Sequence, residues 1–114
     1  MRKTLILAVI MAAFSSCGTQ TQLYNWRGYD GAVYAYTKHS DEKSLESLMM
    51  VYTRLIQNSG GTRKTPPPGI CADYGYLLIQ SGKTEEGKEL LVRETMLYPE
   101  SKLFIDRILK RLER

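Results

Sequence analysis

The sequence predicts an all-α fold: a short, irregular bundle of about five helices after a cleaved signal peptide. Apolar residues recur at spacings of three and four along the chain after residue 22, and strand-like alternation of any length is absent. Capping residues and helix breakers divide this region into segments of helical length. With 114 residues, 43% apolar and 25% charged, the chain has the composition of a folded protein and room for one small domain.

Residues 1–16 have the layout of a secretion signal. Arg2 and Lys3 provide a positive start, and residues 5–14 form an apolar run of ten residues. A helix that crosses a membrane needs about 20 apolar residues, so this run is too short to remain as a transmembrane segment. We therefore expect residues 1–16 to be removed.

The residues around the predicted cleavage point suggest a lipid anchor. Ser15 and Ser16 precede Cys17, an order that resembles the bacterial lipobox. This resemblance implies acylation of Cys17, with residues 18–22 as a short polar tether. Gly18 stands where an aspartate would retain many lipoproteins in the inner membrane, which implies an outer-membrane protein that faces the periplasm. An ordinary signal peptide with an incidental cysteine is the alternative.

The first helix is predicted in a segment dense in aromatic residues, and we expect it to begin at residues 28–30. Offsets of three, four and three place four side chains on one helical face: Trp26, Tyr29, Val33 and Tyr36. Tyr34 falls off that face. The aromatic rings fit two interpretations, as the core of a small bundle or as a surface for a partner.

Residues 41–57 predict the second helix, the most strongly amphipathic one in the chain. Ser40 and Asp41 are its expected N-cap residues, and Glu42 suits the positive end of the helix dipole. Its apolar residues repeat at three and four: Leu45, Leu48, Met49, Tyr52, Leu55 and Ile56. Two glycines at 60–61 then stop the helix, and three prolines at 66–68 force an extended loop.

Three further helices are predicted after this loop: residues 70–80, 84–97 and 101–114. A turn at residues 81–83 separates the first two, and Pro99 ends the second. Thr84 is the expected cap of the helix that it begins. The last helix carries a broad apolar face.

The third and fourth predicted helices have the spacing of the tetratricopeptide signature, W-x2-L-G-x2-Y followed by A-x3-F and a proline. Cys71-x2-Tyr74-Gly75-x2-Leu78 is followed by Gly87-x3-Leu91 and Pro99. Gly75 and Gly87 are small enough for the two helices to cross closely as a hairpin. The resemblance implies a tetratricopeptide-like bundle, and any other small helical bundle is the alternative.

A second resemblance covers nearly the whole chain after Cys17. Its motifs are Y-x-W-x-G-Y-x2-A-x-Y-x-Y from Tyr24, PPPG-x2-A-x-Y-G-Y-L-L from Pro66 and YPES from Tyr98. With the lipobox, they are similar to an uncharacterised family of small bacterial lipoproteins, classed only as a domain of unknown function. The resemblance implies genes encoded beside a curli-secretion-type pore lipoprotein and a third small lipoprotein. It supplies no activity and no catalytic residue.

Charge and motif content argue against several classes of function. The formal charge of +4 falls to +2 without Arg2 and Lys3, and the other basic residues are dispersed, so nucleic-acid binding is not expected. His39 is the only histidine and has no cysteine at ligand spacing, so we expect no metal or cofactor. Nothing assembles a base, a nucleophile and a stabilising donor, so we expect no enzyme. Cys71 is expected to be a buried, unreactive thiol.

The predicted organisation is a signal peptide over residues 1–16, a lipidated cysteine and tether over 17–22 and a helical domain over 23–114. The residues expected to contact a partner are Tyr24, Tyr34, Arg63, Pro66, Pro67, Pro68 and Tyr76. The leading hypothesis is a periplasm-facing outer-membrane lipoprotein that acts as an accessory or adaptor subunit of a curli-type secretion or envelope complex. The alternative is a stand-alone helical-repeat protein that binds peptide or cell-wall material.

Overall fold

The computed structural model of the chain describes residues 1–4, 6, 18 and 21–114. The prediction of an all-α fold is confirmed, since residues 21–114 form five α-helices and one 3-10 helix and no strand occurs among the described residues. Cys17 and most of the predicted signal segment lie outside these residues, so cleavage and lipid attachment stay predictions. Among the helices that the structure describes, none combines the length and apolarity that a membrane crossing requires.

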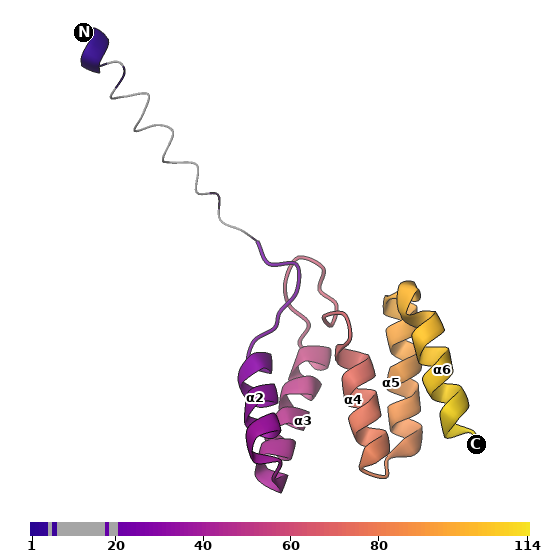
Figure 1. Cartoon of the computed structure of the whole chain (residues 1–114). Coiled ribbons are helices and arrows are strands. Elements are labelled where there is room, and N and C mark those ends of the chain that lie inside the picture. The colour runs from indigo at the N-terminus through magenta and orange to yellow at the C-terminus, as the bar shows by residue number, and fades with distance from the viewer. Residues whose placement is uncertain (5, 7–17, 19–20) are drawn as a thin grey trace.

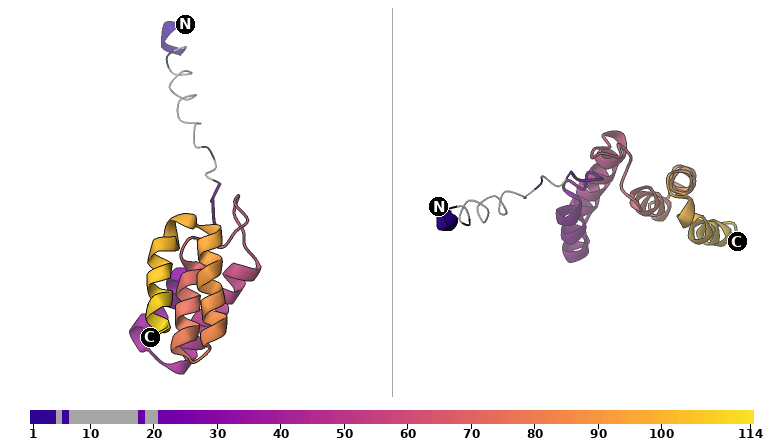
Figure 2. Two further views of the ribbon diagram at one scale, coloured as in Figure 1. Left: turned by 90° about the vertical axis from the view of Figure 1, so that its right-hand side faces the viewer. Right: turned by 90° about the horizontal axis from the view of Figure 1, so that it is seen from above.

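The elements follow one another as two helix pairs and a final helix (Figure 1). They are α2 (Tyr29–His39), α3 (Glu42–Gln57), α4 (Ile70–Gln80), α5 (Thr84–Leu97), the 3-10 helix η1 (Pro99–Ser101) and α6 (Lys102–Leu112). α2 pairs with α3, α4 pairs with α5, and α3 joins the two pairs by packing on α4. Seen from above, α5 lies to one side of the line from α4 to α6, which leaves these two helices facing the same side of the bundle (Figure 2).

The corner between α2 and α3 differs in one respect from the prediction. Asp41 is the N-cap of α3 as expected: its Oδ1 accepts from the Ser44 N–H at 2.8 Å, and the Ser44 hydroxyl accepts from the Asp41 N–H at 3.3 Å. Hydrogen bonds from the side chain and the backbone N–H of Ser44 lower the pKa of Asp41. Ser40, the other predicted cap, instead ends α2 in a left-handed conformation, with φ at 49°, and donates its N–H to the Tyr36 carbonyl at 2.8 Å.

The predicted cap of α5 is wrong. Thr84 is the first helical residue, and Lys83 stands at the N-cap without a side-chain hydrogen bond. The reason lies in the turn before it, where Gly82 has a φ of 90° and the Lys83 N–H donates to the Leu78 carbonyl at 2.9 Å. Because residues 82 and 83 form this turn, Lys83 occupies the N-cap position. The helix therefore begins at Thr84, whereas a Thr84 cap would make residue 85 the first helical residue.

The close crossing of α4 and α5 predicted at two glycines is confirmed. A Cβ atom added to Gly75 would lie 2.6 Å from the carbonyl oxygen of Gly87. A Cβ atom on Gly87 would collide with the Gly75 carbonyl oxygen and the side chain of Ile79. The two helix backbones are therefore in direct contact, and no other residue type fits either position without displacement.

Two groups of buried side chains hold the bundle together. Leu48, Tyr52, Leu55 and Ile70 form the core between α3 and α4, and residues of α2 pack on it from outside. Cys71, Leu78, Leu91 and Ile105 are the buried apolar side chains of the C-terminal half. The predicted burial of Cys71 is confirmed, and this burial raises the pKa of its thiol to about 11, so the thiol stays protonated at neutral pH.

The N-terminus of α4 receives its capping acceptor from another helix. The N-cap residue is Gly69, which has no side chain to offer. Instead, Glu94 of α5 is 2% exposed, and its Oε1 accepts from the Gly69 N–H at 2.7 Å. Burial raises the pKa of Glu94, although this hydrogen bond lowers it. The buried carboxylate thus ties α5 to the start of α4.

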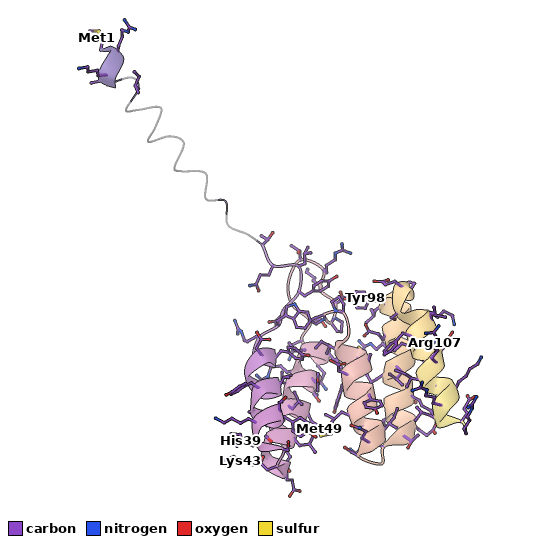
Figure 3. The ribbon with its side chains drawn as sticks, viewed as in Figure 1. Met1, His39, Lys43, Met49, Tyr98 and Arg107 are labelled. Carbon is purple, nitrogen blue, oxygen red and sulfur yellow. The ribbon has the colours of Figure 1, made fainter. Side chains whose placement is uncertain are left out.

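The loop of residues 58–69 is folded onto the bundle. Pro66 and Pro67 are buried, and the Pro66 carbonyl accepts from the Tyr98 hydroxyl at 2.6 Å. Figure 3 shows Tyr98 at the end of the bundle where this loop lies. The N–H groups of Thr62 and Arg63 donate to the carbonyls of residues 22 and 23, each at 3.1 Å. The incoming N-terminal segment is therefore held against the loop, at the same end of the molecule (Figure 1).

Candidate binding groove

Two adjoining hollows form a groove along the side of the bundle that presents α2, α4 and α6. The first lies between α4 and α6, has a volume of about 440 Å³ and is lined by Ala72, Asp73, Tyr76, Phe104, Ile108, Arg111 and Leu112. The second has a volume of about 270 Å³ and is lined by Tyr29, Val33, Tyr36, Leu48, Tyr52, Asp73, Tyr76, Leu77 and Gln80. Asp73 and Tyr76 line both hollows, so α4 forms the floor that connects them.

One wall of the groove is formed by α6, because little of the apolar face of this helix packs against the rest of the bundle. Ile105 is its one buried residue. Phe104, Ile108 and Leu112 follow at intervals of four and line the hollow that opens toward α4. Phe104 remains 64% exposed. The broad apolar face predicted for the last helix is thus present, and three of its residues line the groove.

The α2 wall is aromatic. The Tyr29 ring lies 5.3 Å from the Trp26 ring and 6.1 Å from the Tyr52 ring, and Tyr52 stacks on Tyr74 at 5.5 Å. Tyr52 is buried, whereas Tyr29 and Tyr36 are half-buried against the core. α2 has no fully buried residue, so its tyrosines contribute to both the packing and the groove surface.

Trp26 departs from the face predicted for it. The helix begins at Tyr29, so Trp26 precedes it, and its side chain is 41% exposed. The reason is local: Gly28 adopts a left-handed conformation with φ at 81°, and the Tyr29 N–H closes a turn on the Trp26 carbonyl at 3.1 Å. Trp26 therefore flanks the tyrosines from outside the helix and does not fill the core.

The charged groups of the groove are few. Asp73 stands in the shared floor, and Arg111 lines the half beside α6. The Tyr29 hydroxyl donates to Asp73 Oδ2 at 3.4 Å. Burial raises the pKa of Asp73, and burial together with the charge of Asp73 raises the pKa of Tyr29 and of Tyr52. The two phenols therefore keep their protons and face the carboxylate as neutral groups.

The aromatic residues predicted to contact a partner lie in three different places. Tyr76 is in the groove and 48% exposed. Tyr34 is 66% exposed on α2 and lines neither hollow, with the Lys38 ammonium 5.8 Å from its ring centre. Tyr24 is half-buried, with its ring packed edge-on against Tyr98 at 6.4 Å. The structure thus places one of these three residues in the groove.

The loop residues predicted for the same role lie away from the groove. Pro66 and Pro67 are buried, so they support the loop from inside and present no surface to a partner. Pro68 and Arg63 are exposed. The Tyr98 hydroxyl donates to the Pro66 carbonyl and connects this part of the loop to the end of α5. A role in binding for the exposed pair stays a prediction.

Sequence reasoning missed Asp73, Phe104 and Arg111 as groove residues. A signal for Asp73 was present, because it is the single charged residue in the apolar segment 70–80. For Phe104, the signal was an apolar face broader than one helix contact requires. Which helices border the same hollow depends on tertiary packing, and no local pattern contains that information.

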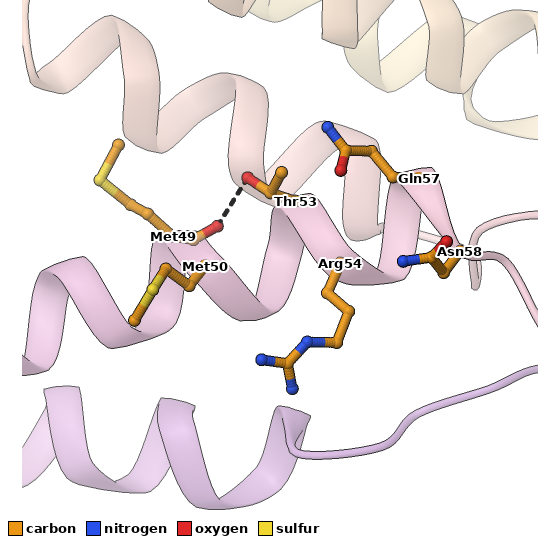
Figure 4. Close-up of a pocket in the computed structure, with 6 residues that line it drawn as sticks. All are labelled: Met49, Met50, Thr53, Arg54, Gln57 and Asn58. Carbon is orange, nitrogen blue, oxygen red and sulfur yellow. Dashed lines mark hydrogen bonds between the residues drawn. The ribbon is translucent and has the colours of Figure 1, made fainter.

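Two other hollows on the surface of the protein are weaker candidates for a binding site. One of about 350 Å³ is lined by residues 49–58 of α3 and its end, and Figure 4 shows these side chains spread along one helix, with Thr53 bonded to the Met49 carbonyl at 2.9 Å. The other lies by His39 and Lys43, at the end of the bundle opposite Tyr98 (Figure 3). The described residues contain no group of three or more His, Cys, Asp or Glu placed to hold a metal ion.

The fold and the groove define a small all-α protein made of antiparallel helix pairs with an open, largely apolar groove on one side. The family described as a domain of unknown function (DUF4810) matches residues 23–108, and the chain belongs to this family. The predicted membership of an uncharacterised family is confirmed. Neither a curated protein nor a solved structure matches the chain.

Proposed function

We propose that this protein is an adaptor of the bacterial envelope that binds a partner protein in the groove formed by α2, α4 and α6. The observation that supports it most is the shared floor at Tyr76, where two hollows join into one surface that spans both helix pairs and α6. Exposed Tyr76 and Phe104 supply aromatic area with little conformational entropy to lose, which is the property of residues that dominate binding energy at interfaces.

The location that we propose is the periplasmic face of the outer membrane, with the lipid on Cys17. Its support comes from the sequence, where the order of Ser15, Ser16 and Cys17 after the apolar run resembles a lipobox. The docking of residues 22 and 23 on the loop is compatible with this arrangement. These hydrogen bonds put residues 22 and 23 at the loop end of the bundle, and neither residue lines the groove (Figure 1).

The partner that we propose is a curli-secretion-type pore lipoprotein, together with the third small lipoprotein that the family resemblance implies. A groove lined by Tyr76, Phe104 and Ile108 suits an apolar segment of such a protein. The second candidate is transient binding of peptide or cell-wall material in the same groove. It is favoured by the aromatic rings of the α2 wall, which offer flat faces for stacking.

The test is a pull-down of the native protein in mild detergent, with mass spectrometry of the proteins that are retained at near-equal amounts. We expect the pore lipoprotein with the wild type and its loss with Tyr76→Ala and Phe104→Ala. Met50→Ala is the matched control, because Met50 is 60% exposed on α3 and lines neither hollow of the groove. Recovery of the wild-type protein alone excludes a stable complex and leaves the second candidate.

Tyr34→Ala separates the groove from the outer surface of α2. Tyr34 is exposed and outside the groove, so we expect its loss to leave both stability and the partner unchanged. If Tyr34→Ala releases the partner while Tyr76→Ala retains it, binding takes place on the outer surface of α2 and the groove is not the site.

Cell fractionation tests the location separately. The wild type is expected in the outer-membrane fraction and Cys17→Ala in the soluble fraction. A Cys17→Ala protein that stays membrane-bound at mature size would refute the lipid anchor without affecting the groove.

A further inference from the structure

The central charge of the groove is a carboxylate that forms no ion pair with any of the described residues. Asp73 lines both hollows. The ion pairs among the described residues are Lys88 with Glu85 and Lys102 with Asp106, and neither pair includes Asp73. The hydrogen bond that Asp73 Oδ2 receives is the long one from the Tyr29 hydroxyl, at 3.4 Å.

The surroundings of Asp73 make this charge unusually available for interaction. Asp73 is an exposed residue, so an arriving cation can reach its carboxylate. Tyr29, Tyr52 and Tyr76 line the hollows with it, and partial desolvation by its surroundings raises the pKa of Asp73. A carboxylate with aromatic rings on one side attracts a cation more strongly than one on an open surface does, because the effective dielectric constant beside it is lower.

We propose that the groove selects a partner segment by one lysine or arginine side chain that pairs with Asp73 while apolar neighbours of that residue occupy the two hollows. This inference rests on the proposed binding function of the groove and specifies the chemistry of the occupant. The aliphatic stem of a lysine or arginine packs on the tyrosine rings, and its cationic end reaches the carboxylate. Arg111 repels further positive charge in the α6 half, so a single basic residue is preferred over a basic run.

The test uses three pools of short, capped peptides whose central residue is lysine, norleucine or glutamate. The flanking positions are random mixtures of alanine, leucine, tyrosine and serine. The full chain in mild detergent is immobilised, and each retained pool is quantified by mass spectrometry. Norleucine is the matched comparison, because it has an unbranched aliphatic side chain like that of lysine and carries no charge.

We expect the lysine pool to be retained about fivefold to tenfold better than the norleucine pool, and the glutamate pool least. Asp73→Asn is expected to bring the ratio of lysine to norleucine close to one, because the amide keeps an acceptor for Tyr29 and loses the charge. Asp30→Asn is the matched control: Asp30 lies in the first turn of α2, as Asp73 lies in the first turn of α4, and it lines neither hollow. Its ratio should equal that of the wild type.

The outcomes separate this inference from the function on which it rests. If lysine and norleucine pools bind equally and Tyr76→Ala abolishes both, the groove binds peptides and the selection by charge is refuted. If a lysine preference survives in Asp73→Asn, the charge that selects is elsewhere and the inference is wrong. Retention that is unaffected by Tyr76→Ala, or no retention of any pool, overturns the groove and the inference together.

Discussion

The two helix pairs of this protein are held together by different kinds of contact. α4 and α5 meet through their backbones, with Gly75 and Gly87 so close that neither tolerates a Cβ atom. α2 and α3 meet through side chains, with Tyr29, Val33 and Tyr36 packed on the core without being fully buried. The first pair is in close backbone contact, and the second leaves these three side chains partly exposed.

This difference between the helix pairs explains why the groove has a fixed floor on α4 and an aromatic wall on α2. A pair in backbone contact presents the outer side of α4 as a fixed floor, with Asp73 and Tyr76 at defined positions. A pair joined by tyrosines presents rings that can shift by small rotations while they keep contact with the core. The contrast predicts that substitutions at the glycine contact have large effects on stability and that surface changes in α2 have small ones.

The largest effect is expected at the glycine crossing. Gly75→Ala and Gly87→Ala each place a methyl group against backbone atoms of the facing helix, and backbone cannot move aside as a side chain can. We expect each substitution to lower the free energy of unfolding by about 3 kcal/mol. Urea denaturation followed by circular dichroism measures this loss. Wild-type stability in both variants would show that α4 and α5 are not in backbone contact.

Glu94→Ala is expected to have the next largest effect. It removes the acceptor of the Gly69 N–H and leaves a cavity beside the start of α4. The expected loss of stability is about 2 to 3 kcal/mol. Glu94→Gln is the control, because its amide oxygen retains the acceptor and most of the volume. Equal losses in both variants would mean that charge, rather than the cap and the packing, provides the stability.

The same residue gives a prediction about pH. Burial raises the pKa of Glu94 above the ordinary value of 4.5, so the folded protein holds this proton more tightly than the unfolded chain does. Its contribution to stability is therefore present at acidic pH and decreases as pH rises through the raised pKa. Wild type should gain stability relative to Glu94→Gln on acidification, because the variant has no carboxyl group at this position to take up the proton. An unchanged difference across that range would show that Glu94 has an ordinary pKa.

Tyr98→Phe tests how the proline loop is fixed. Loss of the 2.6 Å hydrogen bond to the Pro66 carbonyl is expected to cost about 1 kcal/mol, because the carbonyl of a buried residue loses its partner. Tyr34→Phe is the matched control, since its ring is 66% exposed, and it should leave stability unchanged. If Tyr98→Phe is also neutral, this hydrogen bond does not contribute to stability and the other contacts of the loop hold it in place.

Much of the helical framework could be predicted from the sequence. The bounds of α4 and α5 match the prediction because glycine or proline residues stand on both sides of each segment. The glycine crossing was also predictable, since two small residues at the tetratricopeptide spacing have one geometric use. Caps were predicted less well: Ser40 and Thr84 are good capping residues, but the turns beside them decide which residue leaves the helical conformation.

The groove could be predicted in part. Tyr76 was among the residues predicted to contact a partner, and it lies in the groove. Asp73 and Phe104 were not, because they become neighbours only when α6 folds beside α4. The three prolines were predicted to contact a partner, whereas the structure buries Pro66 and Pro67 and leaves Pro68 exposed. Contacts between distant segments are the part of the site that local patterns cannot supply.

The smallest effect, and the one of opposite sign, is expected at Gly31 in α2. A Cβ atom there would meet nothing within 4 Å, in contrast to the crossing glycines. Alanine has the better helix propensity and restricts the unfolded chain, so Gly31→Ala should raise the free energy of unfolding by about 0.5 kcal/mol. The measurement is the urea midpoint at an unchanged slope. A loss of stability in Gly31→Ala would mean that α2 also depends on a close glycine contact. The tyrosines would then no longer account for how α2 and α3 are held together, and the distinction between the two helix pairs would fail.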